Sequence, residues 1–302
     1  MNQKMSIGGQ AVLEGVMMRG TEYLATAVRK NTGEIVYRKR KISSRKKEFY
    51  KMPFIRGMFM LFDSLVLGIQ ELTFSANQSG ETEEENLSQK EAIMTTIVSL
   101  ALGIGLFIVL PSFIGGLLFS ENKLYANLLE AFIRLAGFVL YIWALSFSKD
   151  IHRVFEYHGA EHKSIYAYEN DMELTPENAK KFTTLHPRCG TSFLFIVMLV
   201  AIIVFSCIDF LVPTPETLLG KLALKLILRV GLMPLIASLS YELQRYSSKH
   251  LDHFFVRLLS FPGLSLQRIT TQEPDLSQLE VAIVAIKVSL GEQVQNATEI
   301  LE

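Results

Sequence analysis

The chain has 302 residues, of which 49% are hydrophobic and 20% charged, and its mean hydropathy is +0.27. Apolar residues gathered in blocks are typical of a membrane protein with polar lobes, not of a soluble enzyme. Lys and Arg together equal Asp and Glu at 30 each, so nothing in the net charge favours a nucleic-acid partner. The two cysteines, Cys189 and Cys207, argue against a disulfide framework, and we expect no cleaved leader at the N-terminus.

Residues 1–52 are predicted to form a cytoplasmic N-terminal region. The glycines in residues 8–20 favour a turn-rich lead-in. The alternative is a loop that carries three polar side chains to a site, Gln10, Glu14 and Arg19. Residues 23–41 alternate around Asn31-Thr32-Gly33 and predict a β-hairpin. The basic residues between 38 and 47 are typical of a surface that contacts anionic lipid on the cytoplasmic side.

Residues 53–74 predict a helix that either lies along the membrane interface or enters the membrane, because charges interrupt its apolar sequence. Residues 75–91 are polar and acidic and predict a flexible linker. Residues 92–260 predict a four-span membrane domain, since four segments exceed the roughly 20 residues that a helix needs to cross the hydrocarbon core. These segments are 92–119, 128–147, 191–212 and 219–240.

Basic residues crowd in residues 29–56, in 149–188 and in the tail, whereas the connections 120–127 and 213–216 carry only Lys123. The positive-inside rule therefore places both termini and the segment 148–190 in the cytoplasm of a multi-pass cell-membrane protein. Three cations in the last span argue against this orientation, Lys221, Lys225 and Arg229. The membrane lipid is the expected partner.

Residues 261–302 are predicted to form a cytoplasmic helical region that begins with a break at Pro262. Asp275 and Gln278 have the spacing of a capping box. The helix that they start has one apolar face, which we expect to pack on the cytoplasmic lobe. That face consists of Leu279, Ala282, Ile283, Ile286 and Leu290.

The stretch His158-Gly-Ala-Glu161-His162 carries the chemistry. Two histidines four residues apart project from one face of a helix, so their nitrogens can converge on one metal ion. The order His-x-x-Glu-His occurs among metallopeptidases called inverzincins. Glu161 is then the predicted general base toward a water that the metal activates.

Other polar residues are expected near the same membrane face because they lie at the ends of neighbouring spans. Glu242 is the first candidate for the third metal ligand and His186 the second. Cys189 is a further candidate, although a structural role is the preferred interpretation for it. Arg188 is predicted to neutralise a substrate carboxylate or an oxyanion. Zinc, or another divalent metal, is the expected cofactor.

Simpler interpretations remain open for each residue. His158 and His162 could be interfacial histidines that bond carbonyls, and Glu242 could pair only with Arg245 or Arg188. His250 and His253 form an alternative pair at helical spacing, which an amphipathic surface explains more simply.

The chain resembles the bacterial YqhQ-like family, which is defined by a domain of unknown function. The stretches that carry the resemblance are residues 9–20 (GQAVLEGVMMRG), 157–163 (YHGAEHK), 185–192 (LHPRCGTS), 241–242 (YE) and 270–274 (TTQEP). The resemblance implies a multipass membrane protein of a kind commonly labelled a predicted metal-dependent enzyme, with no settled substrate. It also strengthens the interpretation of residues 9–20 as part of a site.

The sequence thus predicts a mainly α, membrane-embedded, zinc-dependent hydrolase, in first place a peptidase that acts on a membrane protein or peptide at the cytoplasmic face. The alternative is a non-enzymatic scaffold or assembly factor whose polar cluster is structural. A transporter is a third reading, based on Glu130, Arg134 and Arg229 within spans, but no internal repeat supports it.

Overall fold

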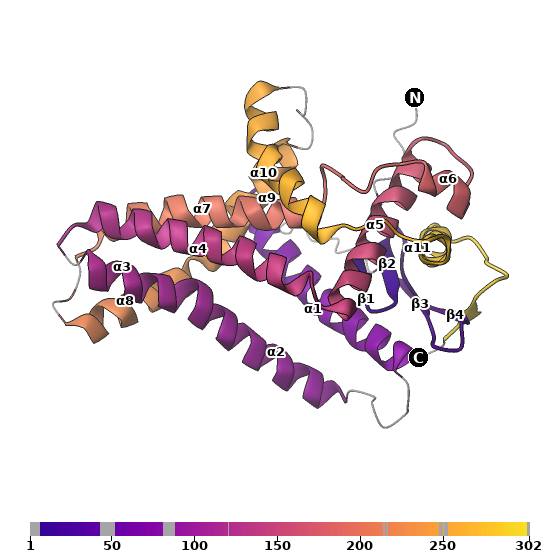
Figure 1. Ribbon diagram of the computed structural model, residues 1–302, viewed down its shortest axis with the longest axis horizontal. Helices are drawn as coiled ribbons and strands as arrows, with labels where there is room; N and C mark the ends of the chain where they lie inside the picture. The colour runs from indigo at the N-terminus through magenta and orange to yellow at the C-terminus, as the bar shows by residue number, and fades with distance from the viewer. Residues whose placement is uncertain are drawn as a thin grey trace.

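The computed structural model describes residues 7–42, 52–80, 88–119, 121–213, 215, 217–247, 250 and 253–300. These residues are mainly helical and form two parts, a lobe around a β-sheet and an elongated bundle of helices (Figure 1). The predicted fold class, spanning helices with a small N-terminal sheet, is confirmed.

The sheet has its strands in chain order, namely β1 (Gly8–Val12), β2 (Gly15–Arg19), β3 (Tyr23–Arg29), β4 (Ile35–Lys41) and β5 (Thr298–Glu299). The predicted hairpin is confirmed as β3 and β4, with Gly33 at a φ of +88° in its turn. The turn-rich lead-in is wrong, because residues 8–19 form a second antiparallel hairpin. Its alternation buries Val12 and Val16, and Gly15 leaves no room for a Cβ beside the Ala27 carbonyl.

Helices cover both faces of this sheet. On one face lie α5 (Lys149–Glu169) and α11 (Leu276–Ser289), with the short α6 (Pro176–Lys180) beside them. On the other face lies α1 (Ile55–Ser79), whose Phe74 packs against strand residues. The lobe is therefore a helix–sheet–helix sandwich, in which alternate strand residues belong to two separate cores.

The basic residues of β4 do not all face outward as a lipid-contacting surface. Glu71 of α1 is fully buried and accepts hydrogen bonds from Thr26 Oγ1 at 2.6 Å and Arg38 Nη2 at 2.8 Å. Arg40 pairs with the same carboxylate at 3.3 Å. Two predicted lipid contacts thus neutralise a buried acid instead, because an unpaired carboxylate there would be costly. Residues 45–47 of the basic segment lie outside the described residues.

The C-terminal helix begins as predicted, with both hydrogen bonds of the Asp275–Gln278 capping box present. The predicted apolar face packs in the lobe core, where Leu279, Ala282, Ile283 and Ile286 are buried and Leu290 packs against them. Burial extends beyond that face, to Val281, Val284, Ala285 and Val288, since the sheet, α5 and α6 surround much of α11. The predicted break at Pro262 is wrong, because this proline lies inside α10 (Phe254–Thr270).

The bundle begins with α2 (Gln89–Ile104), which continues through a π-helical turn, η3 (Gly105–Val109), into α3 (Leu110–Leu118). Next come α4 (Lys123–Leu145) and α7 (Gly190–Leu211). The last predicted span is two helices bent by 45°, α8 (Leu218–Gly231) and α9 (Met233–Ser247). The predicted linker 75–91 is shorter than expected, because α1 runs to Ser79 and Ser88 caps α2; residues 81–87 lie outside the described ones.

Within the described residues, four helices are long and apolar enough to cross a membrane, and the bent pair makes up to five. They are α1, the continuous helix 93–118, α4 and α7. Large apolar side chains on them face outward, among them Leu102, Leu117, Phe132 and Leu140. This is the pattern of a multi-pass membrane protein whose bundle contacts lipid, and it includes α1, whose depth the sequence left open.

Candidate metal centre

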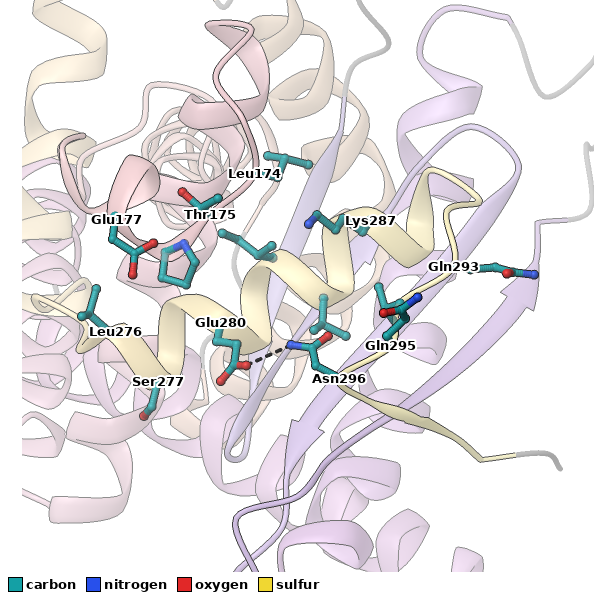
Figure 2. A pocket seen from close by; sticks show the side chains of 14 residues that line it. Leu174, Thr175, Glu177, Leu276, Ser277, Glu280, Lys287, Gln293, Gln295 and Asn296 are labelled. Carbon is teal, nitrogen blue, oxygen red and sulfur yellow. Dashed lines mark hydrogen bonds between the residues drawn. The ribbon is translucent and has the colours of Figure 1, made fainter.

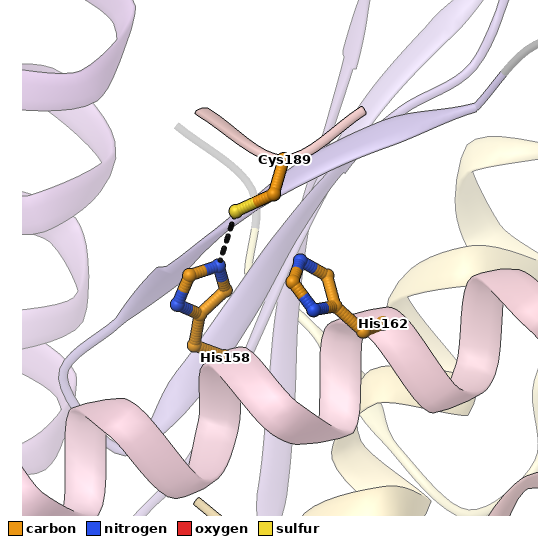
Figure 3. A group of neighbouring side chains, drawn as sticks. All are labelled: His158, His162 and Cys189. Carbon is orange, nitrogen blue, oxygen red and sulfur yellow. Dashed lines mark hydrogen bonds between the residues drawn. The ribbon is translucent and has the colours of Figure 1, made fainter. Parts of the chain in front are cut away.

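The histidine motif lies in the middle of α5, which leaves the bundle after α4 and enters the lobe (Figure 1). Helical spacing puts His158 and His162 on one side of α5, with their ring centroids 4.5 Å apart. Figure 3 shows both rings standing on the helix toward Cys189, which approaches from the segment before α7. The predicted convergence of the two rings is present.

Backbone carbonyls orient both imidazoles. Nδ1 of His158 lies 2.8 Å from the carbonyl oxygen of Thr270, and Nδ1 of His162 forms a short hydrogen bond with the carbonyl of Thr184. A ring that donates from Nδ1 keeps its lone pair on Nε2. The same arrangement holds metal-ligating histidines in their binding tautomer.

The Nε2 atoms face a thiol. Cys189 is buried, and its Sγ lies 3.1 Å from Nε2 of His158 and accepts the N–H of Thr191 at 3.3 Å in the first turn of α7. One ligand atom from each of His158, His162 and Cys189 lies within 4.8 Å of the other two. In the part of the chain that the structure describes, this is the one such group of three.

Gly159 explains why the motif contains a glycine. A Cβ at this position would collide with the carbonyl oxygen of Gln272. The backbone of residues 270–272 therefore lies directly on α5, where Gln272 N–H also bonds the carbonyl of Phe155 at 2.9 Å. This close approach brings the Thr270 carbonyl to His158.

Glu161 is buried beside the first strand. It accepts a hydrogen bond from the backbone N–H of Gly9, where a Cβ would lie only 2.9 Å from its Oε1. Burial raises the pKa of the Glu161 carboxyl, and the neighbouring His158 and His186 partly offset that rise. Burial likewise lowers the pKa of His162 and of His186, which favours the neutral rings that metals bind.

His186 lies next to the three-residue group without joining it. Its ring centroid is 5.4 Å from that of His162, its Nδ1 accepts the N–H of Arg188 at 3.2 Å, and its Nε2 is 3.8 Å from Glu169. Gln267 fixes this loop by bonding both the N–H and the carbonyl of His186. Arg188 itself pairs with Glu169.

Glu242, the predicted third ligand, is bound elsewhere. Both of its oxygens pair with the Arg56 guanidinium of α1, and Nε of Arg56 lies 2.6 Å from Oε1. Cys189 therefore takes the place of Glu242 in the candidate ligand set. The reason is that Arg56 of α1 neutralises the Glu242 carboxylate, and the sequence did not show that α1 lies beside α9.

A cavity of about 600 Å³ opens between the sheet, α1, the start of α7 and the C-terminal half of α9. Gln10, Arg19 and Arg188 line it, as do apolar residues of α1 and α7, among them Met60, Leu61, Leu67 and Phe193. Gly9 and Gly190 connect it to the centre, since Gly9 contacts Glu161 and Gly190 follows Cys189. Two of the three polar residues of the 8–20 segment thus reach this cavity. The third, Glu14, pairs with Arg153.

The other histidines are surface residues. His152 is half exposed and lies 3.6 Å from Glu156, and the exposed His250 stacks on Tyr246. His253 precedes α10 and is exposed. A second cavity, of about 590 Å³, lies on the outer side of α11 (Figure 2), where Asn296 donates to Glu280 at 2.9 Å. It is lined by other elements than the centre, namely α6, α11 and the chain that follows.

Sequence reasoning missed the carbonyls of Thr184 and Thr270, the clamp by Gln267 and the role of Arg56. No side-chain signal marks a backbone carbonyl as a partner. A signal for Cys189 was present, since it lies immediately before a predicted span and so at the end of a helix.

Comparison with known proteins gives the family. Residues 52–292 match the family described as "Protein of unknown function (DUF1385)". The chain is also 37% identical over 295 residues to "Uncharacterized protein YqhQ" of Bacillus subtilis (strain 168), covering 91% of this chain and 89% of that protein. No solved structure matches the chain significantly. With a spanning bundle joined to a sheet lobe and the histidine motif between them, the chain belongs to the DUF1385 family and is a YqhQ-like protein.

Proposed function

We propose that this protein is a membrane-embedded, zinc-dependent hydrolase that cleaves a peptide bond of a membrane protein or peptide. The observation that carries the proposal is the His158–His162–Cys189 group, whose two Nδ1 atoms are bonded to carbonyls while its Nε2 and Sγ atoms face one another. Two imidazoles and a thiolate suit zinc, and three protein ligands leave a coordination position free for chemistry.

The three ligand atoms lie close enough together to bind one metal ion. Two come from the middle of α5 and one from Cys189, the N-cap residue of α7, so metal binding would need to order few side chains. Zinc would supply Lewis acidity and make a water nucleophilic near neutral pH. Cys189 would take the place that the sequence assigned to Glu242.

Glu161 is the residue that would accept and return the proton. Its raised pKa brings the carboxyl closer to the operating range of a general base than that of an exposed glutamate. The Gly9 N–H holds one side of the carboxylate, and Gly9 also lines the cavity. The base therefore lies beside the space where a substrate would bind.

The cavity offers the chemistry of a peptide-binding site. Its apolar wall from α1 and α7 would take side chains of a membrane segment, whereas Arg188 would neutralise a carboxylate or an oxyanion. The basic residues around segment 148–190 favour the cytoplasmic face for this reaction and for both termini.

Metal analysis of detergent-purified protein is the first test. We expect about one zinc per chain, and metal content near background in three separate variants, His158→Ala, His162→Ala and Cys189→Ala. The matched control is His152→Ala, which removes an exposed histidine of the same helix. Wild-type metal content in all three variants, with helical circular dichroism intact, would remove the proposal.

Glu161→Gln separates the hydrolase from a structural metal site in a scaffold. If the protein is a hydrolase, the Glu161→Gln variant should keep its zinc but lose cleavage of a quenched fluorescent peptide library. The assay uses protein in nanodiscs. If wild type and variant, both loaded with zinc, cleave equally, Glu161 is not the base. If the zinc-loaded wild type cleaves nothing, the enzyme assignment fails.

A further inference from the structure

A second polar cluster lies at the opposite end of the bundle from the histidine motif. Arg229 of α8 pairs with Glu130 of α4 and lies 3.2 Å from Asp209 of α7. Lys225 pairs with the same Glu130 and lies 3.7 Å from Asp209. Helical spacing puts Lys221, Lys225 and Arg229 on one stripe of α8, so a single face of this helix supplies the cations.

Positive charge exceeds negative charge in this cluster. Two further cations face it: Lys123 donates to the backbone carbonyl of Asp209 at 3.0 Å, and Arg134 donates to the carbonyl of Phe107 at 2.9 Å. Lys221 has no ion-pair partner among the residues that the structure describes. Among the described residues, five cations thus share the two carboxylates of Glu130 and Asp209 in an apolar bundle, where uncompensated charge is expensive.

Buried donors in the cluster lack acceptors. Within the described part of the chain, Nδ2 of Asn127, Nη2 of Arg134 and Nε of Arg229 find no hydrogen-bond partner. Asn127 is only 8% exposed. All three atoms are N–H donors, so what the cluster lacks is an acceptor and a negative charge.

A small cavity adjoins one of these donors, Asn127, and the Asp209 side of the cluster. Its volume is about 80 Å³, and Ser112, Asn127, Lys221 and Lys225 contribute to its wall together with the aromatic Phe119. The space admits one compact group. An exposed Tyr125 packs against Phe119 with ring centroids 5.8 Å apart, as aromatic side chains do at a membrane interface.

We propose that this cavity binds a phosphate group, which Asn127, Lys221 and Lys225 contact. A phosphate supplies an acceptor for Nδ2 of Asn127 and negative charge for the lysines that line the cavity, and lysine is a common phosphate partner. The group can belong to the headgroup of an anionic lipid in the leaflet at this end of the bundle, or to free phosphate. The site is separate from the metal centre and does not depend on it.

Native mass spectrometry of detergent-purified protein measures the binding of added phosphatidylglycerol, an anionic lipid, and of phosphatidylcholine for comparison. Thermal unfolding with inorganic phosphate in the millimolar range measures whether the free ion stabilises the protein. The variants are Lys221→Ala and Asn127→Ala, which remove groups that form no ion pair with the other described residues and so leave the Glu130 network in place. Lys149→Ala is the matched control, since it removes an exposed lysine at the other end of the bundle.

We expect tighter binding of phosphatidylglycerol than of phosphatidylcholine, and about tenfold weaker binding in each cavity variant, the loss expected for one charge-assisted hydrogen bond. Stabilisation by inorganic phosphate that both variants lose would also support the site and identify free phosphate as its ligand. Binding that Lys149→Ala weakens as much as Lys221→Ala does, or no binding in either measurement, would overturn the proposal.

Discussion

The two polar clusters of this protein lie at opposite ends of α7, with Cys189 before its first turn and Asp209 near its last. Twenty residues of helix, about 30 Å, separate them. Near Cys189 the side chains are imidazoles and a thiol, and backbone carbonyls hold the two rings so that the ligand atoms face one another. Near Asp209 the side chains are ions that mostly bind one another.

The two clusters differ in what their polar side chains bind: those in the bundle form ion pairs with one another, whereas those in the lobe keep ligand atoms directed at a common point. In the bundle, Glu130 of α4 pairs with Lys225 and Arg229 of α8 and so stabilises the packing of these two helices. In the lobe, backbone carbonyls bind Nδ1 of His158 and of His162, so that Nε2 of each ring faces the Cys189 thiol, the arrangement that a metal site requires. Variants of the two clusters should therefore fail in different ways.

The largest effect is expected from Glu130→Leu. The change leaves Lys225 and Arg229 without their shared partner inside the bundle, and breaking one side of a buried ion pair costs about 3–5 kcal/mol of unfolding free energy. Thermal unfolding in detergent measures it. Glu121→Gln, at an exposed position near the same end, is the control, and a Glu130→Leu melting curve that coincides with wild type would contradict the role of the pair.

Gly159→Ala should come next. The new methyl group meets the Gln272 carbonyl, so we expect a loss of about 1–3 kcal/mol from overpacking. Movement of residues 270–272 would also misorient His158, because the Thr270 carbonyl binds its Nδ1. Loss of such a hydrogen bond to a metal ligand lowers metal affinity by about 10–100-fold. Competition with a chromogenic chelator measures the affinity. Gly137→Ala, at a helical glycine with open space around it, should leave the affinity unchanged.

A smaller effect is expected from Glu242→Gln. Arg56 and Glu242 are each partly exposed, and such ion pairs contribute about 1 kcal/mol or less. Zinc content should equal that of wild type, because the proposed ligand set contains Cys189, whereas Glu242 pairs with Arg56. A zinc-free Glu242→Gln protein that is still folded would instead restore the glutamate as a ligand.

The smallest effect is expected from His152→Ala, within about 0.5 kcal/mol, as for exposed positions in general. Its side chain is 47% exposed and makes only a long contact with Glu156. Loss of metal from this variant would show that the zinc is not bound at the buried pair.

Several elements followed from the sequence because local physics determines them. The spanning segments are recognisable from length and apolar composition, the hairpin 23–41 from alternation around Gly33, and the start of α11 from the Asp275–Gln278 box. The convergence of His158 and His162 is equally local, since i,i+4 spacing on a helix suffices.

Other elements depended on distant parts of the chain. The hairpin of residues 8–19 has glycines that suggest a loop, yet it is held by β3 and by the helices over it. The apolar face predicted for α11 is buried, but α5, α6 and the sheet also bury positions outside that face, such as Val281 and Val288.

The sequence by itself determined that this is a mainly helical membrane protein with two histidines facing one way. Only the tertiary structure decided that Cys189 faces them and that Glu242 does not. The reason is that hydropathy and periodicity act along one helix, whereas the third ligand depends on which helix ends are neighbours and on which charges are already paired. Arg56 comes from 186 positions before Glu242 in the chain, and no local pattern connects the two.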